Sequence, residues 1–281
     1  MTKFYSPLRY PGGKRKLADF FSSVCEKNNI NGHYVEPYAG GASVALHLLI
    51  NGFVKKITIN DLDRAIYAFW HSILNDTDKF CDKIRKTDIT INNWKKFKKI
   101  HKNKNKDSLF DLGFATFFLN RTNHSGVIDG GVIGGLKQKG KYKIDCRFKK
   151  EDLIERIKLI AKHKNHIVLR NLDAMDLINE VEANDEDKST IFYFDPPYFL
   201  KGPSLYMNHY EPEDHAKVSE KIQKIKNAKW IVSYDNVPQI RKLYAKSKSK
   251  KYFLTHTAYE IRIGKEIAFH SKGLIVPRIV L

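Results

Sequence analysis

Residues 191–198 read Ile-Phe-Tyr-Phe-Asp-Pro-Pro-Tyr, and this stretch indicates both the class of fold and the place of a site. Its first four residues form a short apolar run, which is typical of a buried strand. Asp195 follows that run directly. Because ligands bind at the carboxyl ends of the strands in open α/β sheets, we expect Asp195 and its neighbours to face a ligand.

The residues after this strand suit a flat ring that carries an amine. An ionised Asp195 only accepts hydrogen bonds, and the carbonyl of Pro196 is a second acceptor, so together they can hold both N–H groups of an exocyclic amine. The proline rings restrict φ, which fixes the two acceptors in advance. Tyr198 can stack on the ring, a contact worth about 1–3 kcal/mol. The alternative is a stiff turn at a strand end that binds nothing.

The composition indicates a globular protein without a membrane span. The chain has 281 residues, of which 42% are hydrophobic, and no apolar run reaches the roughly 18 residues that a span needs. Its three cysteines, Cys25, Cys81 and Cys146, are far apart in the sequence. This spacing argues against a zinc site or a disulfide framework, so we expect no metal and a cytoplasmic location.

The charge of the chain indicates a polyanionic partner. The formal net charge is +19 and the pI is about 9.6, and each phosphate that such a chain neutralises releases counterions. Lysine is densest at residues 95–106 and 137–150, which lie apart from the Asp-Pro-Pro-Tyr stretch. The alternative is a general abundance of lysine, as in proteins from AT-rich genomes.

Strands that alternate with helices predict a parallel sheet. Residues 34–36 and 56–59 have the pattern of strands, separated by a small-residue turn and a helix at residues 44–49. Further strands are expected at residues 166–169, 191–194 and 229–233, with a hairpin of residues 252–259 and 267–276 at the edge of the sheet.

The middle of the chain has a different pattern. Residues 65–120 are mostly helical, whereas residues 121–150 combine glycines with lysines, so we expect a mobile, basic loop or ribbon without a core there. We therefore predict a discontinuous α/β catalytic domain, residues 1–64 and 151–281, interrupted by a basic helical insert at residues 65–150.

Acidic residues lie at the ends of successive predicted strands. Glu36 and Asp61 end the first two, Asp173 follows the third, and Asp195 ends the fourth. A carboxylate after the second strand commonly binds ribose hydroxyls, while the turn at Gly40 lacks the Gly-x-Gly-x-x-Gly pattern of a pyrophosphate loop. Each carboxylate alone is more often a helix cap or a solvated loop residue. Four at equivalent positions favour a nucleoside cofactor.

S-adenosylmethionine fits these demands, because it combines ribose, adenine, a charged tail and a sulfonium that tolerates carboxylates. Near the N-terminus, residues 9–14 read Arg-Tyr-Pro-Gly-Gly-Lys. This tight loop is either a structural turn or a contact with the tail or adenine of the cofactor, and the second reading is favoured beside the strand-end carboxylates. The predicted cofactor contacts are Tyr10, Lys14, Glu36, Gly40, Asp61, Asp173 and Asp195.

In this order the motifs resemble those of the Dam-type (D12 class) DNA adenine-N6 methyltransferases. Asp-Pro-Pro-Tyr is the family's catalytic tetrad, unchanged. Residues 36–42 are similar to its Glu-Pro-Phe-x-Gly-x-Gly loop, with Ala42 in place of the last glycine. The other similar segments are residues 10–14 (Gly-Gly-Lys motif), 60–61 (ribose), 171–173 (adenine) and 118–126 (Leu-Asn-Arg-x-x-x-x-Gly).

The resemblance implies an α/β fold, the seven-stranded S-adenosylmethionine-dependent (Rossmann-like) methyltransferase sheet, with a helical target-recognition insert. It implies double-stranded DNA as the partner, a base flipped out of the duplex, direct methyl transfer to N6, and a role beside a restriction endonuclease. Candidate DNA contacts are Arg121, Asn123, Lys137 and Lys139. Arginine or lysine pairs with guanine and asparagine with adenine, although phosphate is the commoner partner of a lysine.

Three other functions stay open at this point. Two are methylation of an RNA adenine and methylation of cytosine N4; by the resemblance, aspartate rather than serine at the start of the tetrad disfavours cytosine. The third is a silent DNA-binding protein that retains the fold. The target sequence is not indicated, and a monomer is the simplest expectation. We expect Asp195→Ala to abolish transfer and Tyr198→Phe to be mild.

Overall fold

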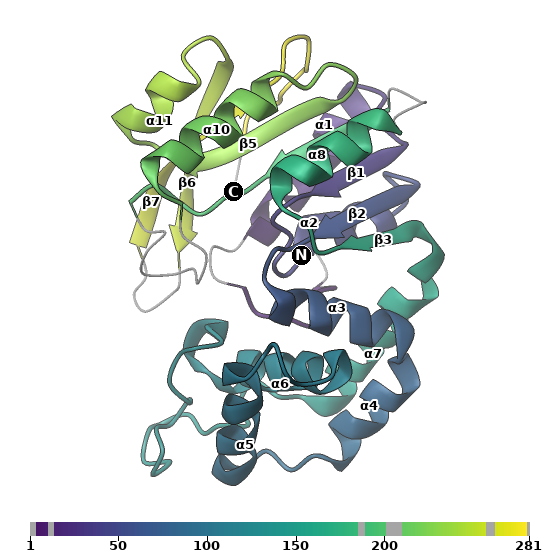
Figure 1. Cartoon of the computed structure of the whole chain (residues 1–281), viewed down its shortest axis with the longest axis vertical. Helices are drawn as coiled ribbons and strands as arrows, with labels where there is room; N and C mark the ends of the chain where they lie inside the picture. Colours follow the sequence, from purple (N-terminus) through teal and green to yellow (C-terminus); the bar gives the residue numbers. More distant parts are fainter. Residues whose placement is uncertain (1–3, 11–13, 185–188, 201–209, 257–261, 280–281) are drawn as a thin grey trace.

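The computed structural model describes residues 4–10, 14–184, 189–200, 210–256 and 262–279. One sheet contains the strands β1 (His33–Glu36), β2 (Lys56–Asn60), β3 (Ile167–Arg170), β4 (Thr190–Phe194), β5 (Lys229–Asp235), β6 (Lys248–His256) and β7 (Arg262–His270). Their order is β3-β2-β1-β4-β5-β7-β6 (Figure 1). β1 to β5 are parallel, and β7 is antiparallel to β5 and β6. This is the predicted seven-stranded methyltransferase sheet, and β6 and β7 form the predicted hairpin a few residues earlier than expected.

Neighbouring residues of the central strands enter two apolar cores, one on each face of the sheet. Val35 and Phe192 pack with residues of α8, α10 and α11, whereas Tyr34 and Ile191 pack with residues of α1 and α2. Because side chains of a strand point alternately to its two faces, a continuous apolar run is what a strand covered on both faces requires. The helices are α1 (Ala18–Lys27), α2 (Ser43–Ile50), α8 (Ala174–Ala183), α10 (Pro212–Gln223) and α11 (Pro238–Leu243).

Five further helices form a lobe below the sheet in Figure 1: α3 (Arg64–Asn75), α4 (Thr77–Lys86), α5 (Ile91–Lys102), α6 (Leu109–Thr122) and α7 (Lys150–Lys162). Aromatic rings hold this helical lobe together. The Phe69 and Phe117 rings stack at 5.9 Å, and the Phe97 and Phe118 rings lie 4.6 Å apart. Their core is continuous with that of one sheet face. The division into a catalytic domain and an insert at residues 65 and 150 therefore stays a prediction.

Polar residues begin several of these helices. The side chains of Asp63, Thr90, Ser108 and Asp173 each accept a backbone N–H from the first turn of α3, α5, α6 and α8 respectively. Such a cap typically contributes about 1 kcal/mol, so these four residues help to determine where the helices start. Two of them, Asp63 and Asp173, also lie at the carboxyl edge of the sheet.

The expectation that residues 121–150 form a loop without a core was wrong. Val132, Ile144 and Phe148 in this segment are at most 5% exposed and join the main apolar core. The Phe148 ring lies 5.3 Å from that of Phe117 on α6. Apolar residues placed irregularly among glycines have no periodicity that predicts burial, yet they reach the core of the neighbouring helices.

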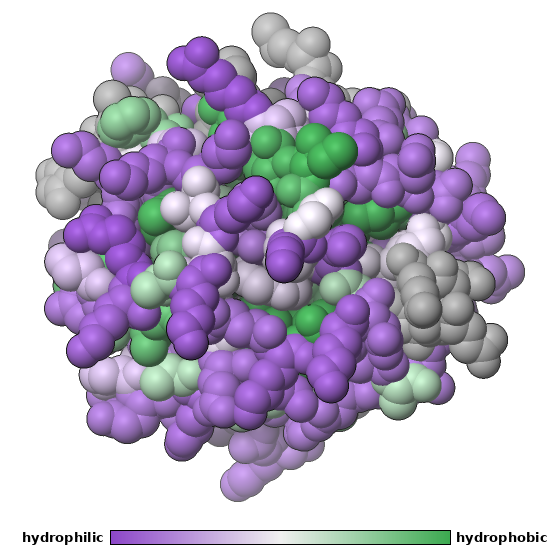
Figure 2. Space-filling view, turned by 90° about the horizontal axis from the view of Figure 1, so that it is seen from above, coloured by the Kyte–Doolittle hydropathy of each residue, from purple (hydrophilic) through white to green (hydrophobic). Residues whose placement is uncertain are grey.

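The face of the molecule seen from above is largely hydrophilic (Figure 2). In the view of Figure 2, hydrophilic residues cover most of the molecule, and small hydrophobic areas show between them. Among the described residues, no helix combines the length and apolar character that crossing a bilayer requires.

Candidate active site

Four neighbouring parallel strands carry acidic side chains at their carboxyl ends. The strands lie in the order β3, β2, β1, β4, so the carboxylates follow along the sheet as Asp173, Asp61, Glu36 and Asp195. Parallel strands end at the same edge of a sheet, which is where open α/β sheets bind ligands. The structure thus brings these four predicted site residues to one edge.

Glu36 is buried between β1 and the start of α2. Its Oε1 atom accepts hydrogen bonds from the Tyr34 hydroxyl and from the Ala45 backbone N–H, each at 3.1 Å. Burial raises the pKa of Glu36 to about 8, although both hydrogen bonds favour the ionised form.

Asp61 binds the turn that follows β1. Its Oδ2 atom accepts the Gly40 backbone N–H at 3.0 Å, and its Oδ1 atom accepts the Asp63 backbone N–H at 3.0 Å. Burial raises the pKa of Asp61 to about 7. A carboxylate has roughly four acceptor positions, so Asp61 can also accept a hydroxyl of a bound ligand.

The turn after β1 depends on unusual backbone conformations. Gly40 has a φ of 45°, and a Cβ atom there would lie 2.6 Å from the ring of Tyr10. Only glycine fits between that ring and the turn. Ala42, which stands where the D12-type motif has its last glycine, has a φ of 46° and adopts the left-handed conformation without being glycine.

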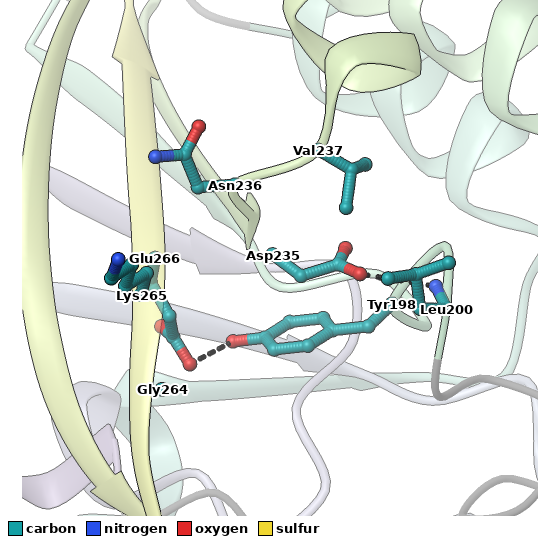
Figure 3. A pocket seen from close by; sticks show the side chains of 8 residues that line it. All are labelled: Tyr198, Leu200, Asp235, Asn236, Val237, Gly264, Lys265 and Glu266. Carbon is teal, nitrogen blue, oxygen red and sulfur yellow. Dashed lines mark hydrogen bonds between the residues drawn. The ribbon is translucent and has the colours of Figure 1, made fainter.

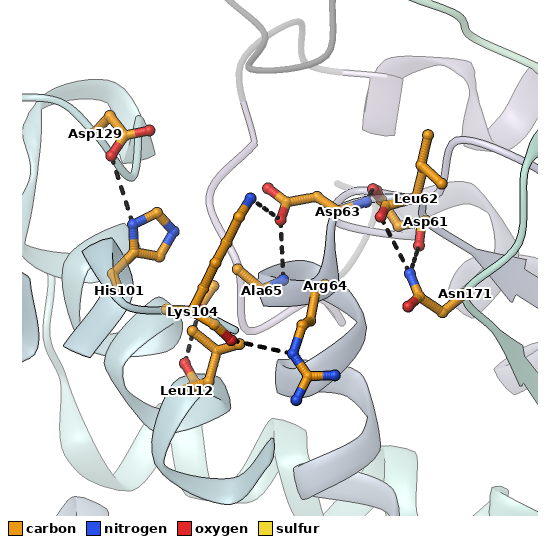
Figure 4. A network of polar contacts seen from close by, with 11 residues as sticks. Asp61, Leu62, Asp63, Arg64, Ala65, His101, Lys104, Leu112, Asp129 and Asn171 are labelled. Carbon is orange, nitrogen blue, oxygen red and sulfur yellow. Dashed lines mark hydrogen bonds and ion pairs between the residues drawn. The ribbon is translucent and has the colours of Figure 1, made fainter. Parts of the chain in front are cut away.

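A chain of polar contacts joins Asp61 to the helical lobe (Figure 4). Asp63, two residues further on, accepts a hydrogen bond from Lys104 Nζ at 3.1 Å, and Lys104 follows α5. The Arg64 Nε atom donates to the Lys104 carbonyl at 3.1 Å, and Asn171 Nδ2 donates to the Asp61 carbonyl at 2.7 Å. The loop that holds Asp61 is therefore fixed from both sides.

Asp173 lies at the end of β3 and caps α8, accepting the Met175 N–H at 2.8 Å. Buried Asn60 ties this strand end to its neighbours. Its Nδ2 atom donates to the carbonyls of Pro37 and Leu172 at 2.9 and 3.0 Å, and its Oδ1 atom accepts the Leu172 N–H at 2.8 Å. One amide side chain thus links the segments after β1, β2 and β3.

Asp195 lies between a cation and a hydroxyl. Its Oδ1 atom is 3.1 Å from Lys14 Nζ and accepts a hydrogen bond from Ser233 Oγ at 3.0 Å. Burial raises the pKa of Asp195 above its ordinary value, while the charge of Lys14 acts in the opposite direction. About a fifth of the side chain, 19%, remains exposed, so the carboxylate is still accessible to a ligand.

Lys14 lies on the side of Asp195 that faces β5 and β7. It begins the short 3-10 helix η1 (Lys14–Leu17), and its Nζ atom donates to the Tyr198 hydroxyl and to Glu266 Oε2, the latter at 3.0 Å. Burial opposes the charge, but the carboxylate of Asp195 raises the pKa of Lys14 well above its ordinary value. The sequence predicts that Lys14 contacts the cofactor, whereas in the structure its Nζ atom binds Asp195, Tyr198 and Glu266. Residues 11–13 of the same motif lie outside the described residues.

A pocket of about 210 Å³ lies beside the Tyr198 ring (Figure 3). The Asp235 carboxylate, at the end of β5, accepts the backbone N–H groups of Phe199 and Leu200, both at 3.0 Å, and so holds the chain after the tetrad. The residues that line the pocket are Tyr198, Leu200, Asp235, Asn236, Val237, Gly264, Lys265 and Glu266.

Of the four candidate DNA contacts, two are buried and two are exposed. Asn123 is fully buried: its Oδ1 atom accepts Trp94 Nε1 at 2.7 Å, and its Nδ2 atom donates to two backbone carbonyls. Arg121 is 9% exposed and donates to the Arg147 carbonyl. Both side chains hold the loop in place, which conflicts with the expectation that they read bases. Lys137 and Lys139 are exposed.

The Leu-Asn-Arg-x-x-x-x-Gly segment also binds the N-terminal segment. Asn120 Oδ1 accepts the Arg9 N–H at 2.7 Å, and Asn120 Nδ2 donates to the Arg9 and Gly126 carbonyls at 2.7 and 2.8 Å. Gly126 has a φ of 77°, and a Cβ atom there would lie 2.2 Å from the Arg9 carbonyl oxygen. The motif therefore joins the loop that precedes Lys14 to the helical lobe.

Sequence reasoning missed three residues of this site. Asp235 is the last residue of β5 and Asp195 directly follows β4, so the same strand-end pattern could have identified Asp235. Ser233 is on β5 and donates to Asp195, but a serine within an apolar strand carries no distinct signal. Glu266 is within β7, where no strand-end pattern applies.

The family model described as D12 class N6 adenine-specific DNA methyltransferase matches residues 10–259. The type II methyltransferase M.MjaIII of Methanocaldococcus jannaschii is 25% identical over 268 residues, which cover 87% of this chain and 89% of that protein. Among solved structures, the rRNA methyltransferase aviRa of Streptomyces viridochromogenes has 12% identity and a TM-score of 0.40, covering 93% of this chain and 85% of the other. Since the family model spans most of its length, the chain belongs to the D12 class of N6 adenine-specific DNA methyltransferases.

Proposed function

We propose that this methyltransferase acts on an adenine that has been rotated out of duplex DNA, and that the base is held beside Asp195 and Tyr198. The observation that carries the proposal is the position of Asp195. Strand-end carboxylates lie on one side of it, and the pocket at Tyr198 lies on the side of β5 and β7. A cofactor site and a base site that meet at one carboxylate suit direct transfer.

S-adenosylmethionine supplies the methyl group when bound. Glu36, Asp61 and Asp173 are the residues that we expect to hold it, because carboxylates suit ribose hydroxyls, an adenine amine and a cationic sulfonium. The acceptor positions that Asp61 keeps beyond its two backbone hydrogen bonds support this assignment. The Tyr10 ring lies against Gly40, in the turn whose backbone Asp61 binds. Tyr10 can therefore contact the cofactor as well.

Asp195 and the carbonyl of Pro196 are proposed to accept the two N–H groups of the target amine. Two such acceptors favour a more tetrahedral nitrogen, whose lone pair is then available for the attack. The Tyr198 ring is proposed to stack on the base. Asp235 supports this role, because it fixes the two residues after Tyr198 by their backbone N–H groups.

The insert, residues 65–150, is proposed to bind the DNA. A base inside the duplex is inaccessible, so the enzyme must bind the backbone and extrude the target. Lys137 and Lys139 are exposed and can reach phosphates. Arg121 and Asn123 are proposed to act indirectly, by holding the loop that carries these lysines.

Transfer of a labelled methyl group tests the assignment. The wild-type protein should label duplex DNA in preference to RNA, and digestion of the product should release N6-methyldeoxyadenosine. Asp195→Ala is the matched negative control, since it removes one acceptor and keeps the pocket. Labelling of RNA alone, or of cytosine, would contradict the proposal.

A restriction-modification role is the second part of the proposal, and the type II methyltransferase of Methanocaldococcus jannaschii supports it. We also propose a cytoplasmic location, because the substrate is DNA and all three cysteines are free thiols. Sequencing of DNA modified by this enzyme would identify the target site. DNA modified there should resist an endonuclease from the same cell, and cleavage at modified sites would contradict the partnership.

A further inference from the structure

Glu266 is a buried carboxylate in direct contact with the tetrad. It lies on β7, and 1% of the residue is exposed. Its Oε1 atom accepts the Tyr198 hydroxyl at 2.7 Å, as Figure 3 shows, and its Oε2 atom accepts Lys14 Nζ at 3.0 Å. Burying a carboxylate costs free energy unless the group is paired and hydrogen-bonded. A second buried carboxylate beside Asp195 is therefore expected to have a role.

The ammonium of Lys14 is shared between two carboxylates. Its Nζ atom lies 3.1 Å from Asp195 Oδ1 and 3.0 Å from Glu266 Oε2. Without Glu266, Asp195 would be the one carboxylate left in an ion pair with this ammonium within the described part of the chain. An ammonium is a stronger donor than the neutral amine of a base, because charge-assisted hydrogen bonds are roughly twice as strong as neutral ones. The target amine would then compete poorly for Asp195.

We propose that Glu266 is a positioning residue for methyl transfer. It divides the attraction of Lys14 between two carboxylates, so that Asp195 keeps the capacity to accept the target amine. It also fixes the Tyr198 ring through the hydroxyl. This inference rests on the proposed function, in which the amine binds Asp195. Glu266 itself acts through Lys14 and Tyr198 and need not touch the base.

Three variants test this division of charge: Glu266→Gln, Lys14→Met and the double variant. Glutamine can still accept the Tyr198 hydroxyl, so Glu266→Gln changes mainly the charge. We expect its kcat on duplex DNA to fall by about 10- to 100-fold, with the KM for the cofactor changed by less than about threefold. This loss is smaller than the roughly 100- to 1,000-fold seen when a direct preorganised contact is removed, because Glu266 acts through Lys14 and Tyr198. Glu180→Gln, which breaks an ion pair with Arg170 elsewhere on the protein, should keep the wild-type kcat.

The double variant separates a positioning role from a merely structural one. Removing Lys14 together with Glu266 leaves Asp195 without the competing ammonium, and also without the charge that lowers its pKa. At a pH high enough to keep Asp195 ionised, the double variant should therefore be at least about fivefold faster than Glu266→Gln, a strongly non-additive result. If the two losses simply multiply, or if Glu266→Gln stays within about threefold of the wild type, the proposal is overturned.

Two measurements keep the outcome interpretable. Thermal unfolding shows whether each variant folds; should Glu266→Gln not fold, a folded double variant that lacks transfer also overturns the proposal. The wild type is assayed first, with the product nucleoside identified. A wild type that does not methylate adenine in DNA refutes the proposed function, whereas an active wild type with multiplying losses refutes only the role of Glu266.

Discussion

Replacing Tyr198 by phenylalanine removes one hydroxyl and leaves the ring in place. Sequence reasoning expects a mild effect, because the ring is the part that stacks on a base. The structure adds a cost, since that hydroxyl donates to Glu266 Oε1 at 2.7 Å. Tyr198 is 6% exposed and Glu266 is 1% exposed, so water cannot replace the lost donor.

The magnitude follows from the kind of hydrogen bond that is lost. A buried hydrogen bond to a charged group contributes about 1.5–3 kcal/mol to the free energy of unfolding. For a domain of this size each kcal/mol shifts Tm by about 2–4 °C, so Tyr198→Phe should lower Tm by about 3–12 °C. Base stacking should be retained, whereas Tyr198→Ala should lose about 1–3 kcal/mol of base capture as well.

Thermal unfolding and the fluorescence of 2-aminopurine at the target position measure these two effects separately. The matched control is Tyr234→Phe, whose buried hydroxyl lies 3.1 Å from the neutral ring nitrogen Nδ1 of His215. Loss of a neutral hydrogen bond should cost only about 0.5–1.5 kcal/mol. Equal losses of stability in the two variants, or loss of the fluorescence change in Tyr198→Phe, would refute the reasoning.

Three other predictions concern the carboxylates and the basic loop. Asp195→Ala should abolish transfer of a labelled methyl group and leave DNA binding in a filter assay nearly unchanged. Transfer by this variant at the wild-type rate would contradict the mechanism. Burial raises the pKa of Asp61 to about 7, so the carboxyl is uncharged below that pH and ionised above it. Cofactor affinity measured by calorimetry should therefore rise as the pH increases through about 7, and Asp61→Asn should lack this rise, leaving only the change that Glu36 contributes near pH 8; a wild-type profile without a rise near pH 7 speaks against Asp61 as a ligand. Replacing Lys137 and Lys139 by alanine should reduce the slope of log affinity against log salt by about 2, whereas Lys226→Ala, at the amino end of the strands, should not; an unchanged slope in the double variant removes their phosphate role.

Much of the sheet could be predicted from the sequence, because its signals are local. The run before Asp195 is apolar at every position, as a strand covered on both faces requires. Glu36 ends β1 and Asp61 directly follows β2, and parallel strands place their carboxyl ends at one edge whatever the loops between them do. Family motifs then added the chemistry of the tetrad.

The basic segment was predicted less well, because burial there does not follow a period. Phe148 and Val132 join the core from an irregular segment rich in glycine. Asn123 and Arg121 belong to a motif that resembles a DNA-facing segment, yet their polar groups bind the backbone of their own loop. A motif indicates that a residue matters, but its hydrogen-bond partners depend on the packing around it.

The sequence by itself determined which chemical groups this protein places at the strand ends, and hence the kind of reaction that it supports. Only the tertiary structure decided the partners of those groups. Lys14 and Glu266 are 252 residues apart in the chain and meet because β7 inserts antiparallel beside β5. Contacts of that kind depend on closing long loops through a shared core, and no local pattern of residues encodes them.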